Sequence, residues 1–239
     1  MASPTLMTSQ HALQPTPTYT WHEKALPTGA CGLTVANKHS QLHQDMWALE
    51  QSSCKRSGFY MDIGSNDGSV LSNTFMLDTK FGWQGVCSDP FPHNMANRTC
   101  AVAQGVVWSE AGKPMTFDQA DGGDDVFSKV DEVSSNREGA IAKSNQNFHK
   151  VTMMSKTANQ IFEEHKVPPV VDFLSLDVEG SETHVLHGIN FQAHCFRNVA
   201  VETNLREPDR SDMRTLFESK GYTYAGSEKF DDYYTNACA

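Results

Sequence analysis

The sequence of 239 residues predicts an α/β fold that is built on a mostly parallel sheet. Three features lead to this prediction: strand-length apolar segments alternate with helical patterns, polar residues end each apolar segment, and Val170–Leu176 is apolar almost throughout. Such a continuous apolar run is typical of a parallel strand that is covered on both faces. In a sheet of this kind, the binding site lies at the carboxyl ends of the strands.

The elements expected before this buried segment begin with a helix over 40–51. The expected strands cover 59–63, 82–88, part of 100–107, and 151–156. A second helix is expected over 70–79, between the first two strands. Thr157 and Gln160 have the spacing of a capping box, which predicts a further helix after the last of these strands.

The elements expected after the buried segment continue the alternation. A helix begins at Ser181, a buried strand covers 199–201, and Gly221 ends one more helix. The segments 222–225 and 233–235 are expected to pair as a closing antiparallel hairpin.

The length of the chain fits one α/β domain with a short extension. Residues 1–20 contain no Lys, Arg, Asp or Glu and lack the pattern of a secretory signal, so we expect a flexible tail. Residues 21–56 are expected to form a helical preamble or lid, and 57–239 the ligand-binding domain. Within that domain, the acidic segment 118–147 has no clear period and is expected to be a long mobile loop, of a kind that often acts as a lid.

The charge balance of 19 basic against 29 acidic residues gives a formal net charge of −10. An acidic surface repels a phosphate backbone, and the lysines and arginines form no basic patch, so we expect no nucleic-acid partner. No apolar run approaches the roughly 18 residues of a membrane span, so we expect no membrane partner.

Six cysteines are spread along the chain, and no two of them have the C-x-x-C spacing of a zinc site. Cys87 and Cys100 lie in apolar, strand-like segments and are expected to be buried free thiols. A chain of this length does not need disulfides, so the sequence favours a reducing compartment and a cytoplasmic location.

The clearest chemical signal is a D-x-G-x-x-x-G turn over 62–68, at the end of the first expected strand. Its glycines let the backbone approach a ligand more closely than a Cβ would allow, although an ordinary tight turn is the alternative. A helix beyond the turn would offer free N–H groups to a carboxylate. Asp89 ends the next strand, where nucleoside-binding folds place an acid on the ribose hydroxyls. The chain contains neither G-x-G-x-x-G nor G-x-x-x-x-G-K-S/T, which favours an adenosyl cofactor over a dinucleotide or ATP.

Several motifs in order make the sequence similar to the FkbM family of S-adenosylmethionine-dependent methyltransferases. They are 58–67, Ser72-Asn73-Thr74, Gly82-Trp83-Gln84-Gly85, Asp89-Pro90, Asn97-Arg98, the D-x-E-G-x-E segment 177–182, Val201-Glu202-Thr203-Asn204, and Gly221-Tyr222. Gln44 and Asp45 also match a Q-D pair before the first strand. The resemblance covers roughly 41–235 and implies a Rossmann-like class I methyltransferase fold. The family more often carries Glu at position 89, and 118–147 aligns with none of its motifs.

The resemblance implies that the turn residues line the methionine part of the cofactor and that Asp89 holds its ribose. Val107 and Trp108 would lie near the adenine, with core packing as the alternative for Trp108. The complete set of expected cofactor-binding residues is Gln44, Asp45, Asp62, Gly64, Ser65, Asn66, Asp67, Gly68, Asn73, Asp89, Val107 and Trp108.

Acidic residues at the ends of two buried strands are the candidates for catalysis. A carboxylate of Asp177, Glu179 or Glu202 can take the proton that an alcohol loses on methylation. Asp177, Glu202 and Asn204 are also candidate ligands of a divalent cation such as Mg²⁺, which prefers oxygen ligands and lowers the pKa of a bound hydroxyl. The alternative is that these groups bind substrate or cap loops.

The predicted function is therefore methyl transfer from S-adenosylmethionine to a hydroxyl oxygen of a small metabolite or glycan. The alternative is a catalytically inactive module that retains the fold for interactions, against which the costly polar residues near the core argue. The net charge disfavours a nucleic-acid methyltransferase, and a homo-oligomer is compatible with the sequence.

Overall fold

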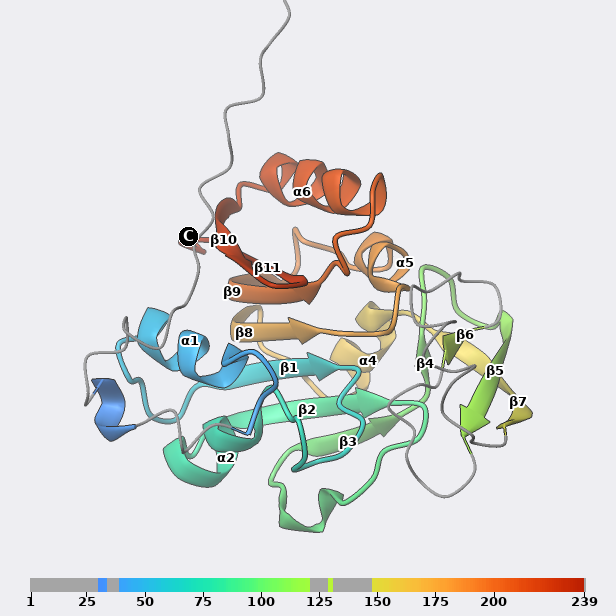
Figure 1. The fold of residues 1–239 in the computed structure, drawn as a ribbon, viewed down its shortest axis with the longest axis horizontal. Coiled ribbons are helices and arrows are strands. Elements are labelled where there is room, and N and C mark those ends of the chain that lie inside the picture. The colour runs from blue at the N-terminus through green and yellow to red at the C-terminus, as the bar shows by residue number, and fades with distance from the viewer. Residues whose placement is uncertain (1–29, 34–38, 121–128, 131–147, 239) are drawn as a thin grey trace, which may run out of the picture.

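The computed structural model describes residues 30–33, 39–120, 129–130 and 148–238 (Figure 1). The tail expected over 1–20 lies outside the described residues. The central feature is a seven-stranded sheet in the order β10-β11-β9-β8-β1-β2-β3. Its strands are β1 (Phe59–Ile63), β2 (Gln84–Asp89), β3 (Ala101–Gln104), β8 (Val170–Leu176), β9 (Cys195–Glu202), β10 (Thr223–Glu228) and β11 (Asp231–Thr235).

The strands from β3 to β9 in this order are all parallel to their neighbours. In contrast, β11 is antiparallel to both β9 and β10. This arrangement confirms the predicted mostly parallel sheet with a closing antiparallel hairpin. The carboxyl ends of the parallel strands point the same way and form one edge of the central sheet (Figure 1).

Helices pack on both faces of this sheet. Trp47 of α1 and Leu77 of α2 belong to one buried apolar cluster, whereas Phe162 of α4, Leu186 of α5 and Phe217 of α6 belong to another. Because α1 lies in the core, the packing favours a fixed part of the domain over a movable lid for this part of 21–56. The helices are α1 (Gln44–Gln51), α2 (Phe75–Phe81), α4 (Ala158–Glu164), α5 (Glu182–His187) and α6 (Asp209–Ser219), with 3₁₀ turns η1 (Ala30–Gly32) and η3 (Met95–Asn97).

The helix expected over 70–79 begins only at Phe75, so the prediction of its start is wrong. The Asp67 side chain accepts hydrogen bonds from the backbone N–H groups of Ser69 (2.8 Å) and Val70 (2.9 Å), which turns the chain away from a helix. Leu71 then has a left-handed backbone with φ of 56°. No helix N-terminus therefore lies at the glycine turn, contrary to the expectation.

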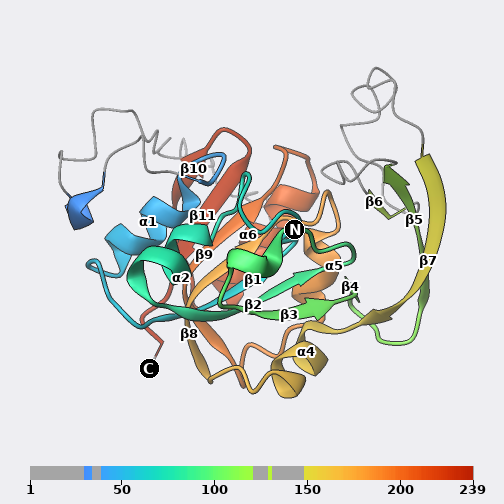
Figure 2. The ribbon, with the colours of Figure 1, turned by 90° about the horizontal axis from the view of Figure 1, so that it is seen from below.

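A second, four-stranded sheet stands beside the carboxyl edge of the central sheet (Figure 1 and Figure 2). The strand expected within 100–107 divides at Gly105, where φ is 150°, so that its two halves belong to different sheets. Two strands also enter the expected loop 118–147, which is a further correction, and the rest of that segment lies outside the described residues. The sheet has the order β4-β7-β5-β6, with β4 (Val106–Val107), β5 (Pro114–Ala120), β6 (Lys129–Val130) and β7 (Phe148–Lys156).

The six cysteines form three disulfides, which join Cys31 to Cys54, Cys87 to Cys100, and Cys195 to Cys238. The expectation that Cys87 and Cys100 are free thiols is therefore wrong. The parallel register of β2 and β3 sets Cys87 opposite Val102, which brings the residue just before β3 next to it. None of the helices in the described part of the chain is long and apolar enough to cross a membrane.

Candidate functional site

A cavity of about 360 Å³ lies where the carboxyl ends of β1, β2, β4 and β8 meet. Parallel strands that end at one edge bring residues from distant parts of the chain together there. The cavity is lined by Gln41, Asp62, Ile63, Gly64, Ser65, Asn66, Val70, Leu71, Ser72, Asn73, Ser88, Asp89, Pro90, Phe91, Gly105, Val106, Val107, Phe117, Asp177, Val178, Glu179 and Ser181.

Gly64 is the residue at which the chain turns from β1 into the cavity wall. Its backbone has φ of 92°, and a Cβ at this position would lie 1.6 Å from the carbonyl oxygen of Asp177. Only glycine avoids both the strain and the overlap. The N–H groups of Gly64 and Ser65 donate to the carbonyl oxygen of Ser88, which fixes the turn against the end of β2.

Asp89 ends β2 with its carboxylate at the cavity. One carboxylate oxygen accepts the N–H of Asn66 (2.8 Å), and the other accepts the N–H of Phe91 (2.7 Å). A carboxylate oxygen has more than one lone pair, so both oxygens can accept a further hydrogen bond from a ligand hydroxyl. The two backbone bonds also hold the carboxylate in a fixed orientation.

Four buried oxygen atoms of cavity residues have no hydrogen-bond partner among the described residues: Ser65 Oγ, Asn73 Oδ1, Ser88 Oγ and Ser181 Oγ. Each of these residues is less than a tenth exposed. A buried polar atom without a partner costs about 1–3 kcal/mol. Four such atoms in residues around one cavity make its wall suited to a polar ligand.

The cavity brings together most of the residues that the sequence predicted. The predicted residues in its lining are Asp62, Gly64, Ser65, Asn66, Asn73, Asp89, Val107, Asp177 and Glu179. The predicted residues outside the lining are Gln44, Asp45, Asp67, Gly68, Trp108, Glu202 and Asn204.

Gln44 and Asp45 lie at the start of α1, where they hold the segment before β1. The Gln44 amide donates to the Asp231 carboxylate (2.6 Å), and Asp45 accepts the hydroxyl of Ser40 (2.6 Å) and the N–H of Met46 (2.8 Å). These side chains form hydrogen bonds within the protein and do not line the cavity. Gln41, which belongs to the same segment, does line it.

Trp108 stacks on His184, with ring centroids 3.9 Å apart, in a small cluster behind the cavity wall. The apolar residues that face the cavity here are Phe91 and Phe117, whose rings meet edge to face with centroids 6.1 Å apart. Sequence reasoning missed both rings. The Asp89-Pro90 motif directly before Phe91 was the only local signal for that residue, and Phe117 enters from β5 of the second sheet.

Three carboxylates meet beside the cavity, because ligand atoms of Asp177, Glu182 and Glu202 lie within 4.8 Å of one another. Asp231 of β11 is in register with Glu202 of β9, which adds a fourth acid at the same edge. Burial raises the pKa of Glu182, and it raises the pKa of Asp231 to about 7. Glu182 and Asp231 were not among the predicted site residues. Asn204 has a left-handed backbone with φ of 47°, and its N–H donates to the carbonyl oxygen of Phe230.

A cluster of carboxylates is a donor set that a hard cation can use. Here, however, the Glu182 carboxylate accepts the N–H groups of Val178 (2.9 Å) and Gly180 (3.1 Å). The positive charge of Arg206 also acts on Glu182, opposing the effect of burial on its pKa. Within the cluster, Glu182 thus already has hydrogen bonds and a cation of its own.

The geometry defines a protein with a ligand cavity at the carboxyl ends of a parallel sheet, lined by a glycine turn, an acid that ends the second strand, and apolar rings. The family model for the methyltransferase FkbM domain matches residues 62–224, which is more than half of the chain. The chain therefore belongs to the FkbM methyltransferase family, as its motifs indicated. No curated protein and no solved structure matches it.

Proposed function

We propose that this chain binds S-adenosylmethionine in the cavity and transfers its methyl group to a hydroxyl oxygen of a small metabolite or sugar. Membership of a methyltransferase family supports the methyl transfer. The observation that carries the proposal for the cofactor is that four residues in the cavity lining have a buried side-chain oxygen with no hydrogen-bond partner in the described part of the chain. We also propose that the central sheet is a Rossmann-like class I methyltransferase sheet.

The lining fits an adenosyl cofactor part by part. The Asp89 carboxylate would accept hydrogen bonds from the ribose hydroxyls, and Phe91 and Phe117 would offer an apolar contact for the adenine. The turn at Gly64 lets the backbone come close to the methionine part, where Ser65 and Ser181 would pair with its polar groups.

The bound cofactor would supply an activated methyl group, so the protein has to position the acceptor oxygen and receive its proton. Of the carboxylates in the cavity lining, Asp177 and Glu179 are the proposed acceptors of that proton. Glu202 lies next to Asp177 in the acidic cluster, and its negative charge would favour a proton on Asp177. Holding like charges close together raises the proton affinity of the group.

Formation of S-adenosylhomocysteine from S-adenosylmethionine, measured against a panel of polyols, sugars and phenols, tests the proposal. We expect turnover with at least one hydroxyl class, and we expect Asp177→Asn to lower kcat by about 10²-fold or more while cofactor binding stays intact. A chain that binds the cofactor but turns over no acceptor would instead be the inactive interaction module.

The same assay tests the metal. Because Glu182 already accepts two backbone N–H groups and is influenced by the positive charge of Arg206, we propose turnover without Mg²⁺. Activity that is lost in EDTA and restored by Mg²⁺ would overturn this proposal and support a metal at Asp177, Glu202 and Asn204.

The disulfides bear on the compartment in which this reaction takes place. The prediction of a cytoplasmic location rested on free thiols, and that premise is wrong. Disulfides form and persist in oxidising environments. We therefore propose that the protein works in an oxidising compartment on a small-molecule or glycan acceptor, without a nucleic-acid partner.

A further inference from the structure

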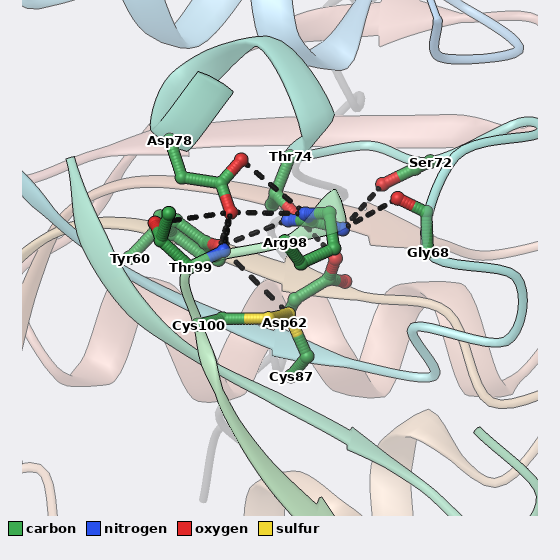
Figure 3. The surroundings of a disulfide bond; sticks show 10 residues. All are labelled: Tyr60, Asp62, Gly68, Ser72, Thr74, Asp78, Cys87, Arg98, Thr99 and Cys100. Carbon is green, nitrogen blue, oxygen red and sulfur yellow. Dashed lines mark hydrogen bonds and ion pairs between the residues drawn. A yellow bond between two sulfur atoms is a disulfide. The ribbon is translucent and has the colours of Figure 1, made fainter. Parts of the chain in front are cut away.

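A buried arginine joins the cavity wall to the sheet. The side chains of Arg98 and Asp78 are both completely shielded from solvent. The guanidinium has five N–H groups, and none of them lacks a partner. They donate, over 2.8–3.2 Å, to the Asp78 carboxylate, the carbonyl oxygen of Gly68, and the hydroxyls of Tyr60, Ser72 and Thr74 (Figure 3).

Three of these partners, Gly68, Ser72 and Thr74, lie in or beside the stretch 70–73, all of which lines the cavity. Gly68 comes just before this stretch and Thr74 just after it. Thr74 also donates to the carboxylate of Asp62 at 2.5 Å, so the far end of the stretch is tied to β1. Arg98 therefore holds the two ends of one cavity wall at fixed positions.

The stretch has an irregular backbone, and other contacts also reach it: the N–H of Val70 donates to Asp67, Leu71 forms an isolated bridge with Ser40, and the Asn73 amide donates to the Ser175 hydroxyl. The helix α2 begins only at Phe75, so residues 70–73 have no helical hydrogen bonds. Leu71 has a left-handed backbone, which is strained for a branched apolar residue. Such a conformation persists only where the surroundings impose it.

A disulfide fastens Arg98 itself to the sheet. Cys100 follows Arg98 by two residues and is bonded to Cys87 of β2. Between them, the N–H of Thr99 donates to the Asp78 carboxylate (3.0 Å), and the Tyr60 hydroxyl lies 3.7 Å from the sulfur of Cys87 (Figure 3). The backbone around Arg98 is thus anchored as firmly as its side chain.

We infer that Arg98 is a positioning residue for the cofactor: anchored by Asp78 and the Cys87–Cys100 disulfide, it sets the cavity wall 68–74 in its binding shape. The inference rests on the proposed function, because the cofactor is the ligand that meets this wall. It gives a role to the Asn97-Arg98 motif, which contributes nothing to the cavity lining itself.

Arg98→Lys tests this inference, because lysine keeps the charge but loses the planar fork that reaches five partners. The matched control is Arg210→Lys. Arg210 forms a bidentate pair with the buried carboxylate of Asp232 (2.9 and 2.7 Å), and neither residue lines the cavity. Both variants are titrated with S-adenosylhomocysteine at a temperature at which circular dichroism shows them folded. Hydrogen exchange over 64–74 is measured in the absence of ligand.

We expect Arg98→Lys to bind at least tenfold more weakly and to exchange faster over 68–74, while Arg210→Lys matches the wild type in both measurements. Equal affinities for both variants would overturn the inference and leave the proposed function intact. Unchanged exchange over 68–74 would also overturn it, because the wall would then keep its shape without Arg98. A folded wild type that does not bind would overturn both the proposed function and the inference.

Discussion

Gly64 shows how much of the cavity depends on one residue. Its positive φ and the carbonyl oxygen of Asp177, 1.6 Å from a Cβ at this position, both exclude a side chain. Gly82 provides a contrast, because it also has a positive φ, of 66°, but has nothing within 4 Å of a Cβ. A side chain at Gly82 would therefore meet backbone strain alone, whereas one at Gly64 would meet both strain and a steric overlap.

We predict that Gly64→Ala lowers the free energy of unfolding by roughly 2–5 kcal/mol, because overlap adds to strain. Gly82→Ala should cost only about 1–2 kcal/mol, from strain alone. Urea denaturation of the two variants measures the difference. Equal losses would show that the contact between the turn and Asp177 does not constrain this site.

The sequence predicted the cavity residues that are marked by a glycine turn or by their position at the end of a strand. Gly64 and Asp89 follow strands whose ends the apolar pattern marks, and both line the cavity. The aromatic wall was not predictable, because Phe117 arrives from a second sheet that the sequence pattern did not reveal. Trp108 was the more conspicuous aromatic residue, but its ring packs on His184.

At the level of elements, the antiparallel pair of β9 and β11 places two acids opposite each other. Glu202 and Asp231 are in register, and both are buried. Burial raises the pKa of Asp231 from 3.8 to about 7, with repulsion from Asp232 and Glu182 in addition. The hydrogen bond from Gln44 opposes this rise without cancelling it.

This shift predicts how stability depends on pH. A carboxyl whose pKa is higher in the folded state contributes stability below about pH 4, and this contribution is lost as the pH rises through 7. The Asp231→Asn variant removes the dependence and still accepts the hydrogen bond from Gln44. Between pH 5 and pH 8, its free energy of unfolding should gain about 2–3 kcal/mol relative to wild type. A difference that stays constant over this range would contradict the shifted pKa.

The helices and strands that are determined by their own local sequence were predicted well. The structure confirms the buried strand Val170–Leu176, and it confirms the helix that begins after Thr157 with a complete capping box. The start of α2 was missed because side-chain contacts decide it: Asp67 accepts the N–H groups of Ser69 and Val70, and Arg98, distant in sequence, engages Ser72 and Thr74. Apolar periodicity does not report such contacts.

At the level of the whole molecule, the three disulfides fasten segments near both ends of the described chain and between two neighbouring strands. One joins the 3₁₀ turn η1 to the residues after α1, and Cys195–Cys238 joins the start of β9 to the end of the described chain. In the chain-entropy description, such links stabilise by restricting the unfolded chain, and more so when the enclosed loop is longer.

We predict that the denatured, unreduced protein has no free thiol, and that its mass rises by two hydrogens for each disulfide on reduction. Removing Cys87–Cys100, which closes 13 residues, should cost about 3 kcal/mol of unfolding free energy. Removing Cys195–Cys238, which closes 43, should cost about 4 kcal/mol. Thiol titration that finds reactive cysteines in freshly prepared protein would contradict the pairing.

The sequence did not reveal this framework because each pairing depends on the assembled sheet. Cys87 and Cys100 individually resemble buried apolar residues, and only the register of β2 and β3 brings them together. Cysteine connectivity cannot be deduced from spacing alone. The parallel order of the strands, in contrast, followed from alternation and apolar runs along the chain.

The most direct test of the central claim is calorimetric titration of S-adenosylmethionine into the folded protein and its Asp89→Ala variant. Asp172→Ala is the matched control, because Asp172 also accepts a backbone N–H, that of Phe59 (2.9 Å), but does not line the cavity. We predict micromolar binding that Asp89→Ala weakens at least 30-fold, equivalent to about 2 kcal/mol, and that Asp172→Ala weakens far less. Absence of binding by the folded wild type, or equal binding by Asp89→Ala, would contradict the account.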